Sequence, residues 1–304
     1  MGRGKTPKAD RRQMDIVFHI GANCTDGEKL IRSLSLNTTA LASQGIAVPN
    51  PTRYRRLLRE TIEALGGQPP DPGTRDTLMA AILDDQSSKR LVMSNPSFIC
   101  LPSRVFEGGG FYKVAAAKLL ALRSLFPQDQ IHLHMAIRNP ATFVPALWEQ
   151  AKRVRLAAFL GGIEPASIRW SDVVALIKQT LPDVSLTLWC NEDTPLIWAE
   201  IMRRLTGTPP GQSLRGEFDL LSTIMSPEGM SRFLKYLGSH PPQTDAQTRR
   251  IIAAFLDKYA LADEIEEEVD VPGWDEPLVA RLTALYEEDI QRIAANPAVT
   301  FIAA

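Results

Sequence analysis

The chain has 304 residues, of which 44% are hydrophobic and 23% are charged, and these proportions are those of a globular protein. Its formal net charge of -1 does not favour a nucleic-acid-binding protein, because such proteins usually carry a strongly basic domain. The sequence has no apolar run long enough to span a bilayer, and its three cysteines lack the spacing of a disulfide framework or a zinc site. We therefore expect a cytoplasmic protein with no membrane span, no nucleic-acid partner and no bound metal.

The N-terminal segment, residues 1–12, contains five basic residues but no apolar core of a signal peptide. We predict a disordered basic tail there, followed by a single domain over residues 13–304. Apolar runs rich in β-branched and aromatic residues predict strands at 16–20, 91–93, 131–137, 184–189 and 299–302.

Longer segments with helical spacing of apolar residues lie between these strands, for example at 28–43 and 57–65. Two later helices have clear start signals, because Thr194 and Ser226 are each followed directly by a proline. Strands that alternate with helices predict a mainly parallel sheet with helices on both faces, a three-layer α/β/α sandwich. Residues 206–304 contain one short strand signal and otherwise predict a helical extension, including an amphipathic helix over 278–293.

The loop after the first strand is the most informative part of the sequence. A strand, a glycine-containing turn and a helix follow one another, and this order can direct backbone amides towards an anion. The loop differs from the Walker A motif, because five residues separate Gly21 from Gly27 and Glu28 follows. Thr25 and Glu28 have the spacing of a capping box, which predicts that the helix start is covered by the protein's own carboxylate.

The ordered landmarks of the first half of the chain resemble those of the sulfotransferases that use 3′-phosphoadenosine-5′-phosphosulfate (PAPS). Bacterial members of that family open with a strand and a His-Ile-Gly-x-x-Lys-Thr-Gly-Thr-Thr loop, and this chain matches it at four positions. They continue with a Leu-x-x-x-Gly-Ile-x-x-Pro stretch, matched here at 41–49, and with an Arg-x-Pro after a later strand, matched at 138–140. The matching residues of the loop are His19, Ile20, Gly21 and Thr25.

The resemblance implies a P-loop-like fold and transfer of a sulfuryl group from PAPS to a hydroxyl or amine of a small-molecule or carbohydrate acceptor. It also implies a nucleotide site made by the loop and by one arginine. These residues are Gly21, Ala22, Asn23, Cys24, Thr25, Asp26, Gly27 and Arg138.

The chain departs from the family pattern at several of these positions. Cys24 stands where the family has its loop lysine, and Ala146 stands where a serine would join the arginine on the nucleotide 3′-phosphate. Asn95 ends the strand whose last residue in many relatives is a candidate base. An alternative is therefore a non-catalytic relative with a self-capped, empty loop, in which Arg138 bridges Asp26 or Glu28 instead of a ligand. A third is an enzyme with another donor that uses Cys24 directly.

Two further groups have both a functional and a structural interpretation. His132 and His134 project to one face of a strand and could bind a metal with His19, or could be packed under a helix. An arginine cluster at 53–59 could recruit an anion, or could form an ordinary solvated helix face.

Overall fold

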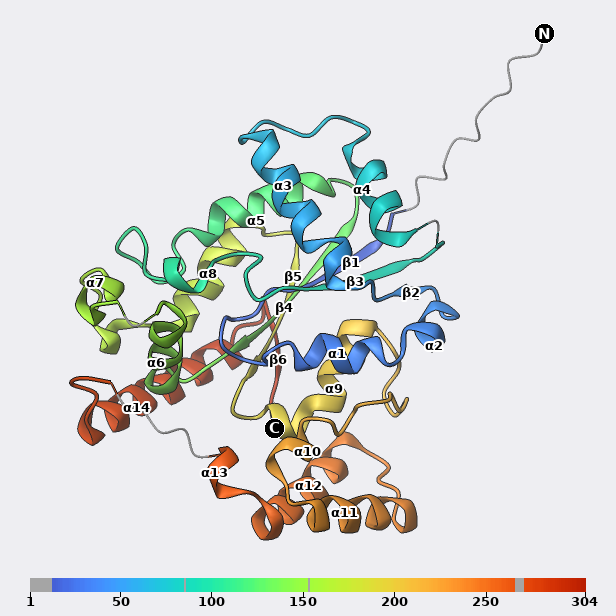
Figure 1. Cartoon of the computed structure of the whole chain (residues 1–304), viewed down its shortest axis with the longest axis vertical. Helices are drawn as coiled ribbons and strands as arrows, with labels where there is room; N and C mark the ends of the chain where they lie inside the picture. The colour runs from blue at the N-terminus through green and yellow to red at the C-terminus, as the bar shows by residue number, and fades with distance from the viewer. Residues whose placement is uncertain (1–12, 85, 153, 266–270) are drawn as a thin grey trace.

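One parallel sheet organises the part of the chain that the computed structural model describes, residues 13–84, 86–152, 154–265 and 271–304 (Figure 1). The predicted basic tail lies outside these residues. The strands are β1 (Asp15–His19), β2 (Ile46–Ala47), β3 (Arg90–Ser94), β4 (Gln130–Ile137), β5 (Ser185–Cys190) and β6 (Thr300–Ile302). Neighbours in the order β2-β3-β1-β4-β5-β6 are all parallel, so the carboxyl ends of the strands meet at one edge. This confirms the predicted parallel sheet.

Helices cover both faces of the sheet, as the alternation of apolar side chains along the strands requires. Val17 faces a layer made by α1 (Lys29–Ser35), α2 (Thr38–Ala42) and α9 (Thr194–Thr206). Ile16 and Phe18 face the opposite layer. That layer contains α3 (Arg55–Leu65), α4 (Thr74–Leu83), α5 (Ala115–Leu125), α6 (Pro140–Gln150), α7 (Leu156–Leu160), α8 (Trp170–Thr180) and α14 (Glu276–Ala294). The three-layer α/β/α sandwich is therefore confirmed. Three short 3-10 helices, η1 (Pro51–Arg53), η2 (Pro102–Arg104) and η3 (Pro165–Ser167), lie in the connections.

The region after α9 is mostly helical, as predicted, and it has a small apolar core of its own. It contains α10 (Leu221–Ile224), α11 (Pro227–Ser239), α12 (Asp245–Tyr259) and α13 (Ala262–Ile265). Leu221, Met225, Phe233 and Ile252 form this core. The predicted amphipathic helix is α14, which returns to the main sheet and packs against α6 and α8. That residues 13–304 form one domain stays a prediction.

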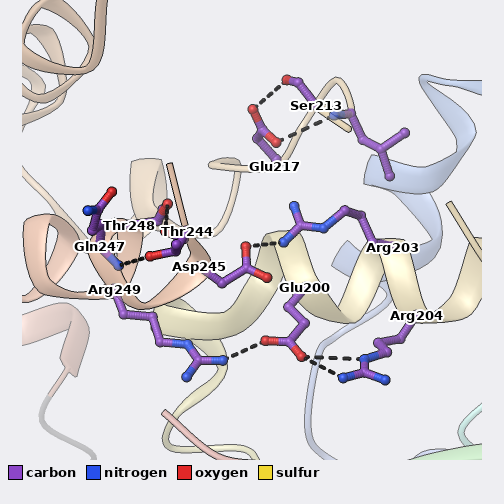
Figure 2. Close-up of polar contacts among 11 residues, drawn as sticks. Glu200, Arg203, Arg204, Ser213, Glu217, Thr244, Asp245, Gln247, Thr248 and Arg249 are labelled. Atoms are coloured by element: carbon purple, nitrogen blue, oxygen red, sulfur yellow. Dashed lines mark hydrogen bonds and ion pairs between the residues drawn. The ribbon is translucent and has the colours of Figure 1, made fainter. Parts of the chain in front are cut away.

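Ion pairs attach α12 to α9 and so join the helical region to the sheet (Figure 2). Glu200 on α9 accepts from Arg249 on α12 and from Arg204 on its own helix. Arg203, which is nearly buried, pairs with Asp245 at the start of α12. No helix among the described residues is long and apolar enough to cross a bilayer.

Candidate functional site

The loop that joins β1 to α1, residues 20–28, lies at the carboxyl edge of the sheet. Its first part continues alongside β4, because the amide of Ala22 donates to the carbonyl of Ala136 at 2.9 Å and the amide of Ala136 donates to Gly21 at 2.7 Å. Gly21 has a φ of +110°, and a Cβ at this position would lie 3.0 Å from the amide nitrogen of Asn23. Glycine is therefore required here by the backbone conformation and by the close approach of the chain.

Asn23 fastens the middle of the loop to the segment that follows β3. Its side-chain amide donates to the carbonyls of Pro96, at 2.9 Å, and Cys100, at 3.2 Å. Its side-chain oxygen accepts from the hydroxyl of Tyr112 at 2.7 Å, and its backbone amide donates to the same hydroxyl at 3.3 Å. Asn23 and Tyr112 are both buried, so these bonds satisfy groups that water does not reach. Asn23 thus has a structural role that its position in the sequence pattern did not indicate.

The predicted capping box at the start of α1 is wrong. The hydroxyl of Thr25 donates to a carbonyl three residues earlier, and Glu28 has a left-handed φ of +65° outside the helix. Gly27 is also left-handed, with a φ of +55°, and α1 begins only after Glu28. The side chain of Asp26 instead accepts from the amide of Leu30 at 3.1 Å. A carboxylate of the protein does bond to the helix start, as expected, but it is that of Asp26.

Arg138 reaches the loop from the end of β4, so the structure brings together the two parts of the predicted site. One terminal nitrogen of its guanidinium, Nη1, donates to the carbonyl of Cys24. Its Nε donates to the hydroxyl of Thr142 at 3.1 Å. Arg138 is 8% exposed, so its charge lies in a largely desolvated position, where electrostatic interactions are stronger than in water.

One alternative for Arg138 was a bridge to Asp26 or Glu28, but among the described residues Glu28 pairs with a different arginine. The carboxylate of Glu28 pairs with Arg55, which comes from the start of α3 on the other side of the loop. The Nε of Arg55 donates to the carbonyl of Ser94 at 3.0 Å, and its Nη2 is buried with no hydrogen-bond partner among the described residues. The sequence showed Arg55 only as one member of a basic cluster, and nothing in its spacing indicated that it turns inward.

The other arginines of this cluster form ordinary surface ion pairs. Each pairs with a carboxylate on its own helix or just after α4, and their side chains are between 41% and 78% exposed. The pairs are Arg53–Asp84, Arg56–Glu60 and Arg59–Glu63. The interpretation of a solvated helix face therefore holds for these three arginines and fails for Arg55.

A second set of contacts fixes the backbone that carries Arg138. The indole of Trp170 donates to the carbonyl of Arg138 at 2.8 Å. The next amide, that of Asn139, donates to one carboxylate oxygen of Glu192 at 2.7 Å, and the hydroxyl of Tyr286 donates to the other at 2.9 Å. Burial raises the pKa of Glu192 and raises the pKa of Tyr286 well above its ordinary value. Glu192 and Tyr286 were not predicted, and the only signal for Glu192 is its position just after a strand.

His19 and His134 are buried in the sheet, whereas His132 is partly exposed. His19 shares a 2.9 Å hydrogen bond between its Nδ1 and the hydroxyl of Ser94, and burial lowers its pKa. His134 is also buried, and its pKa lies well below the ordinary value for the same reason. His132 bonds to the hydroxyl of Ser185 at 2.7 Å. Among the described residues no group of three or more histidine, cysteine or carboxylate side chains could hold a metal ion.

Comparison with known proteins gives a distant structural likeness. No protein-family model matches the chain, and no curated protein matches it in sequence. Among solved structures, a sulfotransferase from Alicyclobacillus acidocaldarius is similar to this chain at 12% identity and a TM-score of 0.38. The match covers 85% of this chain and 97% of that protein. At this level of similarity the match assigns no role to any residue.

Proposed function

We propose that this chain is a sulfotransferase-like protein that binds a PAPS-type nucleotide between the loop after β1 and Arg138. The observation that carries the proposal is the approach of the Arg138 guanidinium to the loop at Cys24. Ligands of parallel α/β sheets bind at the carboxyl edge of the strands, which is where both groups lie. A guanidinium is also well suited to phosphate, because its donors form a fork that matches two phosphate oxygens.

In the proposed reaction the acceptor oxygen or nitrogen forms a bond to the sulfur of PAPS, the bond from sulfur to the phosphate oxygen breaks, and the acceptor loses a proton. The protein contributes mainly by positioning donor and acceptor and by stabilising the charge that develops. Arg138 would neutralise a phosphate of the nucleotide. Asn23 would hold the loop in place, while Cys24 contributes no charge at the position of the family's lysine. The acceptor is a small molecule or a carbohydrate.

Thermal unfolding with and without 3′-phosphoadenosine-5′-phosphate (PAP) tests this proposal. Nucleotide at a hundred times its Kd should stabilise the folded protein by about 2.7 kcal/mol. The Arg138→Met variant should lose most of this stabilisation. Thr142→Val is the matched control, because it removes one hydrogen bond of Arg138 and leaves the charge in place. The absence of any shift at millimolar PAP would refute the proposal.

The second candidate function is a non-catalytic relative, and the observation behind it is the negative charge of the loop. Asp26 and Glu28 place two carboxylates in the loop, and each would repel a phosphate at 4 Å by about 4 kcal/mol at an effective dielectric constant near 20. Radiolabelled PAPS with a panel of hydroxyl and amine acceptors separates the two candidates. Absence of both PAP binding and transfer of label would support the non-catalytic relative with an empty loop, whereas a sulfated product would exclude it.

A further inference from the structure

We propose that Arg55 supplies the cation that the loop lacks at Cys24, and that Glu28 occupies this cation when no anionic ligand is bound. The inference rests on the proposed nucleotide-binding function and names a specificity-determining residue for it. In this arrangement the carboxylate of Glu28 is an internal competitor for the ligand.

The position of Arg55 relative to the loop is the first argument. Arg138 contacts the loop at Cys24, and Arg55 contacts it at Glu28, four residues further along. Residues 24–28 are therefore contacted by two guanidinium groups, one from the residue that follows β4 and one from α3. An anion bound against this loop would be within reach of a cation at either end of it. The loss of the lysine consequently leaves the loop with two cations beside it.

The hydrogen bonds of Arg55 are the second argument. Its Nε is fixed by the carbonyl of Ser94, which also accepts from the hydroxyl of Tyr54 at 2.9 Å. Its Nη1 bonds to Glu28, while its Nη2 is buried without a hydrogen-bond partner among the described residues. A buried, unsatisfied donor costs free energy, so the site would gain from an additional acceptor. A phosphate or sulfonate oxygen is such an acceptor, and it can bond to both terminal nitrogens at once.

The exposure of Glu28 is the third argument. Its side chain is 42% exposed and that of Arg55 is 24% exposed, so the carboxylate can turn out to water when a ligand replaces it. Ion pairs near the surface contribute little to stability, about 1 kcal/mol or less, so displacing Glu28 weakens ligand binding by roughly fivefold at most. An anion with more negative charge than a carboxylate overcomes this competition.

A double-mutant cycle measured by calorimetric titration with PAP tests the proposal. We expect Glu28→Gln to tighten PAP binding by roughly threefold to fivefold, because the competing charge is removed. We expect Arg55→Met to weaken it by about tenfold to a hundredfold, which is the range for a charged hydrogen bond. Arg56→Met is the matched control, since Arg56 lies one residue further on the same helix and pairs with Glu60 at the surface. Its PAP affinity should equal that of the wild type.

The double variant Glu28→Gln/Arg55→Met decides whether Arg55 touches the ligand. If Arg55 acts only by neutralising Glu28, its loss has no effect once Glu28 is uncharged. Direct contact predicts that the loss persists at its full size, and an unchanged affinity in this background overturns the inference while leaving the proposed function intact. The absence of PAP binding in the wild type and in every variant overturns the proposed function, and this inference with it. If Arg55→Met does not fold, Arg55→Gln takes its place, because glutamine can still donate to Ser94 but has no charge.

Discussion

Replacement of Tyr286 by phenylalanine should destabilise the protein in a way that depends on pH. The change removes the hydroxyl that donates to Glu192 at 2.9 Å and has the carbonyl of Ile137 as an alternative acceptor at 3.3 Å. Glu192 keeps the amide of Asn139 as a donor, but its other carboxylate oxygen loses its partly buried hydrogen bond. A hydrogen bond to a charged group contributes about 1.5–3 kcal/mol, so we expect a loss of about 2 kcal/mol near neutral pH.

The pH dependence follows from the raised pKa of Glu192. Because burial raises this pKa above its ordinary value of 4.5, the folded state binds the proton more tightly than the unfolded state. The contribution of Glu192 to stability is therefore greatest at low pH and falls as the pH rises from 4.5 through the raised pKa. Without the tyrosine donor the charged form is less stable still. The loss caused by Tyr286→Phe should accordingly be larger at about pH 8 than at about pH 5.

Chemical denaturation at both pH values measures the two losses directly. At the higher pH the melting temperature should also fall, by roughly 4 °C for a loss of this size in a chain of this length. Tyr236→Phe is the control, since Tyr236 is 40% exposed on α11 and should change stability by less than about 0.5 kcal/mol at either pH. An equal loss at the two pH values, or a loss no larger than that of the control, would refute the reasoning.

Three further predictions concern other parts of the molecule. His134 is buried and its pKa is strongly lowered, so the wild type should lose stability as the pH falls below 6.5. In His134→Gln the free energy of unfolding, measured by urea denaturation at several pH values, should fall less over the same range. Gly229→Ala should destabilise the helical region, because a Cβ there would lie 2.4 Å from the Cβ of Tyr259, and faster hydrogen exchange of the region would show it. Gly238→Ala on the same helix is the control: its Cβ meets open space, so it should be neutral or stabilising by up to about 1 kcal/mol. Asn23→Ala should cost about 2–3 kcal/mol in chemical denaturation, since the buried hydroxyl of Tyr112 loses its acceptor and the carbonyls of Pro96 and Cys100 lose their side-chain donor. A loss below about 1 kcal/mol would contradict this role of Asn23.

The sheet could be predicted from the sequence because its signals are local. Of the six strands in the described residues, five coincide with apolar runs that contain β-branched or aromatic residues, and their alternation with helical segments indicates parallel pairing. The strand that was missed, β2, contains only Ile46 and Ala47, and a two-residue strand has no periodicity to detect. The start of α11 was also correct, because Ser226 accepts from the amide of Gly229 at 3.2 Å. Thr194 proved to be the first helical residue of α9 instead of its cap.

The loop could be located from the sequence, but its hydrogen bonds could not. A capping box requires the threonine to be the N-cap residue and the glutamate to lie in the first turn of the helix. Here Gly27 and Glu28 both have a positive φ and lie outside the helix. The helix consequently starts too late for Thr25 to cap it. The N-cap residue is Glu28, and the side chain of Asp26 accepts from the amide of Leu30. The contacts of Asn23 were equally hidden, because its partners lie between 73 and 89 residues further along the chain.

The absence of the lysine does not by itself give the charge around the loop, because other elements also bring charged groups to this edge of the sheet. Within the loop, the departures remove one positive charge and add the carboxylates of Asp26 and Glu28. In the folded protein, however, Glu28 is matched by Arg55, and Arg138 holds the loop at the carbonyl of Cys24. Neither arginine belongs to the loop, and Arg55 comes from a cluster that the sequence left open as either an anion-recruiting group or a solvated helix face. If the proposed site is correct, the positive charge that it offers a ligand depends on whether Glu28 releases Arg55, and this depends on an ion pair outside position 24.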